Sequence, residues 1–98
     1  MAIQYQFLPE KKKYKIMSKR KKLLEKAFNN PNGLRISEFE TLLENCDWKR
    51  DRQNGSHQIW YSPKKYPLSV QDIAGKAKGY QVKQFLDRYN KENNSTHA

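Results

Sequence analysis

Three segments of the chain place apolar residues on one face of a predicted amphipathic helix, and the last of them follows the i, i+3, i+4, i+7 spacing. The first is expected over residues 18–29, with Ser18 as its N-cap. The second is expected to begin at a capping box formed by Ser37 and Glu40 and to end near Cys46. The third follows a glycine-rich stretch late in the chain. The apolar stripes are formed by Leu23, Leu24, Ala27 and Phe28, then by Ile36, Phe39, Leu42 and Leu43, and last by Val82, Phe85, Leu86 and Tyr89.

The segment between the second and third helices is typical of β-strands. Residues 48–53 and 56–61 are predicted to form a hairpin, because Asn54-Gly55 supplies the two positive-φ residues of a type I′ turn. A third strand is predicted over residues 66–71, and a flexible basic loop is predicted over residues 75–79. We therefore expect a small α+β, two-layer fold laid out like the double-stranded-RNA-binding domain. Its three-stranded antiparallel sheet has helices on one face, in an α-β-β-β-α core, and a basic helix precedes that core.

The two ends of the chain are predicted to lie outside the packed domain. Ile3, Tyr5 and Phe7 alternate as in a short strand, and a run of lysines follows Pro9. We interpret residues 1–15 as a basic, mobile arm that either tracks RNA or docks a partner. A single domain is expected over residues 16–92, with the extra helix at 18–29 and the core at 34–92. Residues 93–98 are predicted to be a disordered tail.

Charge and composition narrow the possible partners. Twenty Lys and Arg against ten Asp and Glu give 98 residues a net charge of +10. This favours nucleic acid as partner, followed by an anionic membrane surface and then an acidic protein. No apolar run approaches the roughly 18 residues of a membrane span, and no signal-peptide pattern opens the sequence. A single cysteine fits a reducing compartment, so we expect a soluble, cytoplasmic protein.

His57 is the candidate catalytic residue, because it follows the predicted turn and has Lys49, Arg50 and Arg52 just before that turn. An imidazole beside fixed positive charges suits phosphodiester chemistry, although the single histidine taken by itself favours a strand-end residue without a role. Cys46 closes an apolar stripe and is expected to be a buried hydrophobe. Two histidines and one cysteine, none at ligand spacing, argue against a metal site, and no cofactor is predicted.

Five motifs give the sequence a family resemblance. They are residues 36–43, the Arg-Gln-Asn-Gly-Ser-His segment at 52–57, Tyr-Ser-Pro at 61–63, and residues 75–78 and 80–86. From Leu34 onward the sequence resembles the HicA family of bacterial toxins. This resemblance implies a ribonuclease acting on messenger RNA, with His57 as the catalytic histidine of the Gly-Ser-His motif. It also implies inhibition by a HicB-like antitoxin, which we expect to be acidic. Many members carry a second histidine after a proline at the end of the third strand, where this chain has residues 67–71.

The expected reaction is cleavage of RNA without a metal. The 2′-hydroxyl must lose a proton as it attacks phosphorus and the leaving oxygen must gain one, and a histidine can serve either step. Positive groups would stabilise the phosphoryl charge. The expected RNA-binding residues are Lys49, Arg50, Arg52, Ser56, Lys76 and Lys78, with Asn54 and Gly55 setting the turn. The sequence leaves open whether Trp48, Trp60 or Tyr61 stacks on RNA bases, although at least one tryptophan is expected in the core. A non-catalytic RNA-binding module and a protein-interaction module with an acidic partner remain alternatives.

Overall fold

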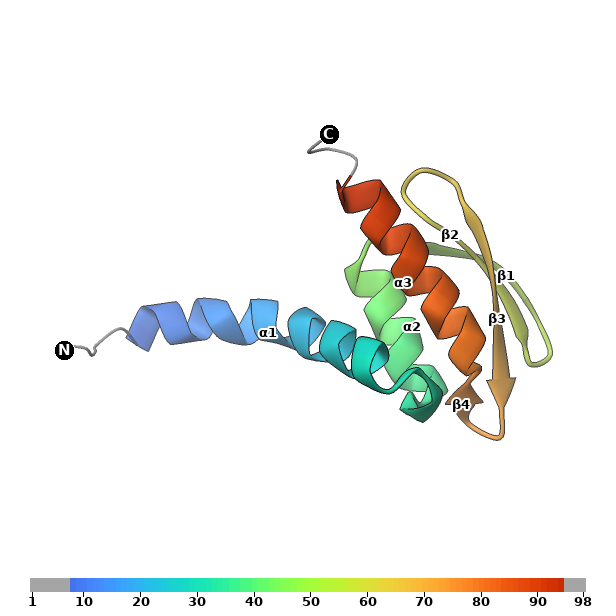
Figure 1. The fold of residues 1–98 in the computed structure, drawn as a ribbon, viewed down its shortest axis with the longest axis horizontal. Helices are drawn as coiled ribbons and strands as arrows, with labels where there is room; N and C mark the ends of the chain where they lie inside the picture. Colours follow the sequence, from blue (N-terminus) through green and yellow to red (C-terminus); the bar gives the residue numbers. More distant parts are fainter. Residues whose placement is uncertain (1–7, 95–98) are drawn as a thin grey trace.

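The computed structural model describes residues 8–94, and the side chains of residues 19–93. All the helices lie on one side of a four-stranded antiparallel sheet, whose opposite face is open (Figure 1). The strand order is β1-β2-β3-β4. This confirms the predicted α+β class and is compatible with a small domain of the double-stranded-RNA-binding type, with one strand more than predicted. The elements are α1 (Leu8–Asn29), a 3-10 turn η1 (Pro31–Gly33), α2 (Ile36–Asn45), β1 (Lys49–Asn54), β2 (His57–Tyr61), β3 (Pro67–Ile73), β4 (Lys76–Ala77) and α3 (Gly79–Asn94).

The core forms where the sheet meets α2 and α3. Phe85 lies at its centre, with its ring 5.7 Å from that of Phe39 and 5.4 Å from that of Trp48, both edge-on. Each such ring contributes roughly 1.5–3 kcal/mol through burial. Trp48 and Trp60 are only 3% and 1% exposed. Both tryptophans therefore belong to the core, and neither is available to stack on a base.

Helix α1 begins at Leu8 rather than at Ser18. Pro9 falls in the first turn, where its missing N–H is not needed, so it opens the helix. Ser18 is an interior residue of this helix, not its cap. The helix therefore includes part of the predicted arm, and the strand predicted around Ile3 and Tyr5 lies outside the described residues.

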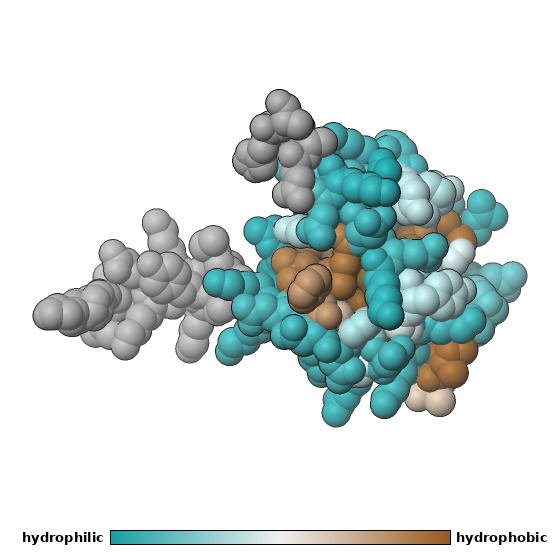
Figure 2. Space-filling model, viewed as in Figure 1, coloured by the Kyte–Doolittle hydropathy of each residue, from teal (hydrophilic) through white to brown (hydrophobic). Residues whose placement is uncertain are grey.

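Helix α1 packs against α2 and α3 rather than on the sheet. Ala27 is fully buried, but Phe28 is 72% exposed, which corrects its assignment to the buried stripe. Figure 2 shows apolar surface in the region where α1 meets α3. Leu24, Phe28 and Leu86 border a hollow of about 390 Å³ between these two helices.

The start of α2 differs from the predicted capping box. Arg35 is the N-cap, and its backbone N–H donates to Glu38 Oε1 over 3.0 Å. That hydrogen bond, with the Lys26 ammonium 3.0 Å away, lowers the pKa of the Glu38 carboxyl. The box predicted at Ser37 and Glu40 is wrong because Ile36 is already helical. Glu40 instead faces the sheet.

The hairpin turn is shifted by one residue from the prediction. Asn54 pairs with His57, so the two loop residues are Gly55 and Ser56. In this turn only Gly55 has positive φ, at +62°, as in a type II′ turn with glycine first. The predicted type I′ turn at Asn54-Gly55 is therefore wrong, and Asn54 serves as the last residue of β1.

The predicted loop at residues 75–79 is ordered structure. Lys76 and Ala77 form β4, which returns alongside β3 after a tight turn at Ala74 and Gly75, with φ of +52° and +86°. Strand β3 consequently runs to Ile73. At the other end, α3 extends to Asn94, and the Asn93 carboxamide donates to the Tyr89 carbonyl over 2.7 Å. The predicted tail thus begins as helix, and residues 95–98 lie outside the described residues.

Candidate nucleic-acid interface

His57 lies on the open face of the sheet. Side chains alternate along β2, so Gln58 and Trp60 point into the core while His57, Ile59 and Tyr61 point the other way. The face that His57 shares is therefore the solvent side, and the imidazole is exposed. Among residues 19–93, no side chain holds the His57 ring by a hydrogen bond or an ion pair. The imidazole is free to meet a ligand but has no orienting carboxylate.

A β-bulge separates the two arginines that precede the turn. Arg50 pairs with Trp60 and Arg52 with Ile59, so Asp51 is an extra residue in β1. Because paired residues point to the same face, Arg52 lies on the open face with His57, whereas Arg50 lies on the core face. The Arg52 side chain is 73% exposed, and its nearest acidic group is Asp51, with Nε 3.4 Å from Oδ2. Lys49, opposite Tyr61, shares the open face nearer the other end of the hairpin.

Arg50 has partners within the fold. Its guanidinium lies 5.8 Å from the centre of the Trp60 ring, and Nη1 is 4.0 Å from Glu40 Oε2. Nη1 also donates to Gln53 Oε1 over 3.3 Å. The role indicated by these contacts is to fasten β1 to α2.

A buried amide anchors the strand that carries His57. Gln58, only 2% exposed, donates to Glu40 Oε2 over 2.6 Å and accepts from Trp60 Nε1 over 2.7 Å. Both ends of this side chain are therefore satisfied, and β2 is held to α2 directly beside His57. Sequence reasoning missed this residue because nothing local marks a buried glutamine.

The turn bearing His57 is joined to the β3–β4 end of the sheet. The Ser56 carbonyl accepts from the Asp72 N–H over 2.9 Å, and the Gly75 carbonyl accepts from Ile36 N–H over 2.9 Å. A β-bridge then sets Arg35 beside Lys76. The turns β1–β2 and β3–β4 and the start of α2 thus lie at one end of the molecule (Figure 1). Arg35 was missed because only this long-range pairing brings it near the site.

The remaining predicted contacts divide into two groups. Ser56 and Lys76 are exposed at this end, and Lys76 pairs with Ile73 at the edge of the sheet. Lys78 is half-buried, and its ammonium lies 5.2 Å from the centre of the Tyr80 ring. The sheet also places Gln71 directly opposite His57, a neighbour that only the register reveals. Arg52 therefore shares the open face with His57, and Ser56 and Lys76 lie at the same end of the sheet, while Lys49 lies farther along the hairpin and Arg50 and Lys78 have other contacts.

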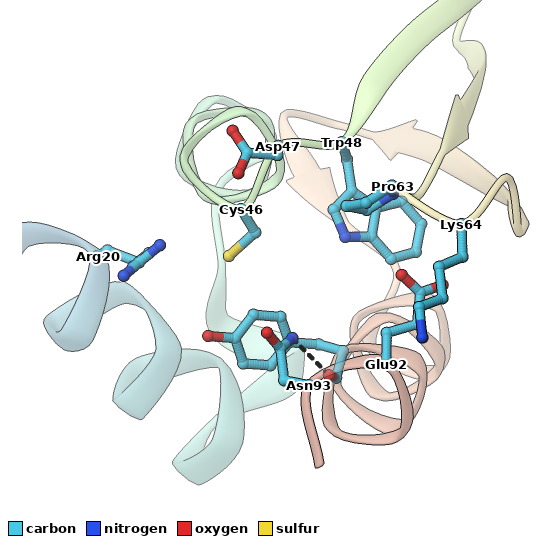
Figure 3. A pocket seen from close by; sticks show the side chains of 9 residues that line it. Arg20, Cys46, Asp47, Trp48, Pro63, Lys64, Glu92 and Asn93 are labelled. Carbon is cyan, nitrogen blue, oxygen red and sulfur yellow. Dashed lines mark hydrogen bonds between the residues drawn. The ribbon is translucent and has the colours of Figure 1, made fainter. Parts of the chain in front are cut away.

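A hollow of about 210 Å³ lies at the other end of the sheet, between α1, the end of α2 and the β2–β3 loop (Figure 3). The Cys46 thiol points into it, and burial raises the pKa of this thiol to about 11. The cysteine is thus a buried, protonated residue, as predicted, and no histidine lines the hollow. The residues lining it are Arg20, Cys46, Asp47, Trp48, Pro63, Lys64, Tyr89, Glu92 and Asn93.

Glu92 closes one side of this hollow. Burial by itself would raise the pKa of its carboxyl, but hydrogen bonds from Ser62, Arg88 and the backbone of Lys64 lower it overall. Ser62 Oγ donates to Glu92 Oε2 over 2.5 Å and accepts the Tyr66 N–H over 2.9 Å. The carboxylate therefore ties the β2–β3 loop to α3, which is a structural role.

Among the side chains described, those of residues 19–93, no group of three or more His, Cys, Asp or Glu is placed to hold a metal ion. No helix within residues 8–94 is long and apolar enough to cross a membrane. Comparison with known families matches residues 36–89, more than half of the chain, to the HicA toxin of bacterial toxin–antitoxin systems. The match runs from the start of α2 into α3 and leaves α1 outside. Neither the curated proteins nor the solved structures gave a significant match.

Proposed function

Because the chain belongs to the HicA toxin family of bacterial toxin–antitoxin systems, we propose that it is an endoribonuclease that cleaves messenger RNA and so blocks translation. His57 is its catalytic residue, and the cleavage needs no metal. The observation that carries the proposal is the position of His57. It is exposed beside the turn on the open face, on a strand fixed from behind by Gln58.

The chemistry follows from one imidazole and its cationic neighbours. The 2′-oxygen loses its proton and attacks the adjacent phosphorus while the bond to the 5′-oxygen breaks, leaving a cyclic phosphate and a 5′-hydroxyl. His57 acts as base for the first proton or acid for the second, and water or the RNA itself serves the other. Arg52, on the same face, stabilises the negative charge that develops on the phosphoryl oxygens.

The RNA in this proposal lies across the open face and the end of the sheet. Arg52 and Lys49 contact phosphates on the open face, and Ser56 and Lys76 contact them at the end. Gln71, opposite His57 in the register, is placed to hold the imidazole or the RNA by a hydrogen bond. A HicB-like antitoxin of acidic character neutralises the toxin by covering this basic surface.

A non-catalytic RNA-binding module is the second candidate. It is favoured by one observation, namely that no described side chain orients the His57 ring. General acid–base catalysis by a histidine usually depends on such an orienting group. In this alternative the same surface binds RNA without cutting it.

The test is cleavage of a labelled messenger RNA in EDTA by wild type, His57→Ala and the control His97→Ala, which removes the other histidine. We expect wild type and His97→Ala to cut, and His57→Ala to lose about 10²–10⁴-fold in rate while binding RNA as before. Binding by all three proteins with cleavage by none would instead support the binding module. Cleavage by His57→Ala at the wild-type rate would refute the role of this residue.

A further inference from the structure

Helix α1 carries most of the positive charge of the protein. Residues 8–29 contain nine Lys and Arg against two Glu, which is +7 of the total +10. The segment that matches the toxin family, residues 36–89, contains nine basic and seven acidic residues, which is only +2. The attraction of this protein for a polyanion therefore comes mainly from a helix outside the family segment.

Five of the eight lysines of α1 follow a regular spacing in the sequence. Lys11, Lys15, Lys19, Lys22 and Lys26 recur at i, i+4, i+8, i+11 and i+15, which corresponds to one side of a helix. We call these five residues the lysine stripe. At about 1.5 Å per residue the stripe is roughly 22 Å long. Among its members with described side chains, Lys19, Lys22 and Lys26 are all exposed.

The stripe leads toward the end of the molecule that carries His57. Lys26 forms an ion pair with Glu38 in the first turn of α2, and Lys19 and Lys22 border a hollow of about 330 Å³ between α1 and α2. Arg35 follows at the start of α2, and the β-bridge sets it beside Lys76. The C-terminal end of α1, the start of α2, β4 and the β1–β2 turn lie along the same edge in Figure 1.

We propose that α1 is an RNA-binding arm. The lysine stripe holds the phosphates of a single-stranded RNA, and the path over Arg35 and Lys76 delivers that strand to His57. This rests on the proposed function in taking RNA as the nucleic acid. In this proposal, most of the affinity for RNA comes from α1, which does not contact the phosphate that reacts.

The arrangement of the stripe favours RNA over an acidic protein. A nucleic-acid strand presents a phosphate at every nucleotide, which matches cations repeated along a helix, and such binding needs no apolar anchor. Protein interfaces instead depend on a few buried aromatic or arginine anchors. Among the described side chains of α1, the exposed large apolar residue is Phe28, which lies by the groove with α3 and not in the stripe.

The test compares two triple variants that remove equal charge. The stripe variant carries Lys15, Lys19 and Lys22→Gln, and the control variant carries Lys65, Lys83 and Lys91→Gln, at exposed positions away from the stripe. Glutamine keeps the helix propensity of lysine. Both are made in the His57→Ala background, and binding of a fluorescent single-stranded RNA is measured across salt concentrations. The outcome then does not depend on whether His57 cuts RNA.

We expect the stripe variant to bind about ten- to a hundredfold more weakly near 0.1 M salt. A plot of the logarithm of its RNA association constant against the logarithm of salt concentration should be less steep by about 2. The reason is that each lost phosphate contact reduces this slope by about 0.7. The control variant should change much less. A Lys→Arg version of the stripe variant should bind like the parent, which separates loss of charge from loss of folding. In the cleaving protein, the stripe variant should raise KM and leave kcat near its original value.

Equal affinities and equal salt slopes for the two triple variants would overturn the proposal. So would a stripe variant that keeps its RNA affinity and loses binding to an acidic antitoxin, because α1 would then be a protein-docking helix. A fall in kcat with KM unchanged would also overturn it. The binding results are obtained without cleavage and so do not depend on the outcome of the His57→Ala cleavage assay, whereas the kcat and KM comparison is made only if the wild type cleaves RNA.

Discussion

Arg50 and Arg52 are two residues apart in the sequence, and their replacement by glutamine should have opposite consequences. Arg52 lies on the open face with His57, and its side chain is 73% exposed. Arg50 lies on the core face between Trp60 and Glu40. We therefore expect Arg52→Gln to reduce RNA cleavage at nearly unchanged stability. Arg50→Gln should reduce stability with a smaller effect on cleavage.

The magnitudes follow from the contacts of each guanidinium. In the proposed function Arg52 gives one charged hydrogen bond to the phosphoryl group, worth about 1.5–3 kcal/mol, so kcat/KM of Arg52→Gln should fall about ten- to a hundredfold. Arg50→Gln loses a half-exposed cation–π contact of about 0.5–1 kcal/mol and a long ion pair worth less. A loss of about 1 kcal/mol lowers the Tm of a domain of this size by about 4–8 °C.

The assay measures kcat/KM on a short RNA and Tm by circular dichroism for both variants and the wild type. The reasoning is refuted if the two variants lose activity equally while keeping the wild-type Tm. That result would mean that both arginines contact RNA and that the bulge at Asp51 does not separate them. The double variant should show roughly additive losses, since the two side chains share no partner.

Two further predictions concern the hollow at the other end of the sheet. Glu92→Gln should lower the free energy of unfolding by about 1–3 kcal/mol, since it disturbs a buried hydrogen-bonded carboxylate. Because the pKa of Glu92 is lowered from 4.5 in the folded protein, this difference should be fully present above pH 4.5 and shrink as pH falls through the folded pKa. Denaturant titrations across acidic pH measure it, and a gap that widens on acidification would contradict the argument. Cys46, whose pKa is about 11, should react with iodoacetamide at neutral pH at least about tenfold more slowly than after unfolding in urea, as followed by mass spectrometry. Equal rates in the two states would show that the thiol is accessible and ionised.

The pattern of apolar residues was sufficient to predict the helices, because helical periodicity depends on burial of one face, whereas the hairpin was predicted from its turn residues, since β1 contains no apolar residue. Their boundaries were harder to predict. Pro9 was interpreted as a terminator, yet proline is compatible with the first turn of a helix. Strand β4 has only two residues, which is too short to show a period, and it exists because β3 and Leu34 offer backbone partners to it. Such long-range pairings leave no local signal.

The geometry of the candidate site was predictable only in part. His57 was proposed from its motif and from its position after the turn; the structure places it on an exposed face, and its catalytic role stays a prediction. The separation of Arg50 from Arg52 was not predictable, because a one-residue bulge reverses the face of every residue beyond it. Likewise Gln58 and Arg35 acquire their roles from Glu40 and Lys76, which are distant in sequence.

Strand β1 forms one edge of the sheet, and all six of its residues are exposed. An exposed edge presents unpaired backbone groups that can recruit a strand from another molecule and start aggregation. This edge strand contains the charged residues Lys49, Arg50, Asp51 and Arg52, and the bulge at Asp51 interrupts the regular pattern of backbone hydrogen bonds. The opposite edge, β4, is only two residues long. Both edges are therefore poor templates for strand addition, so copies of this protein can accumulate without joining edge to edge.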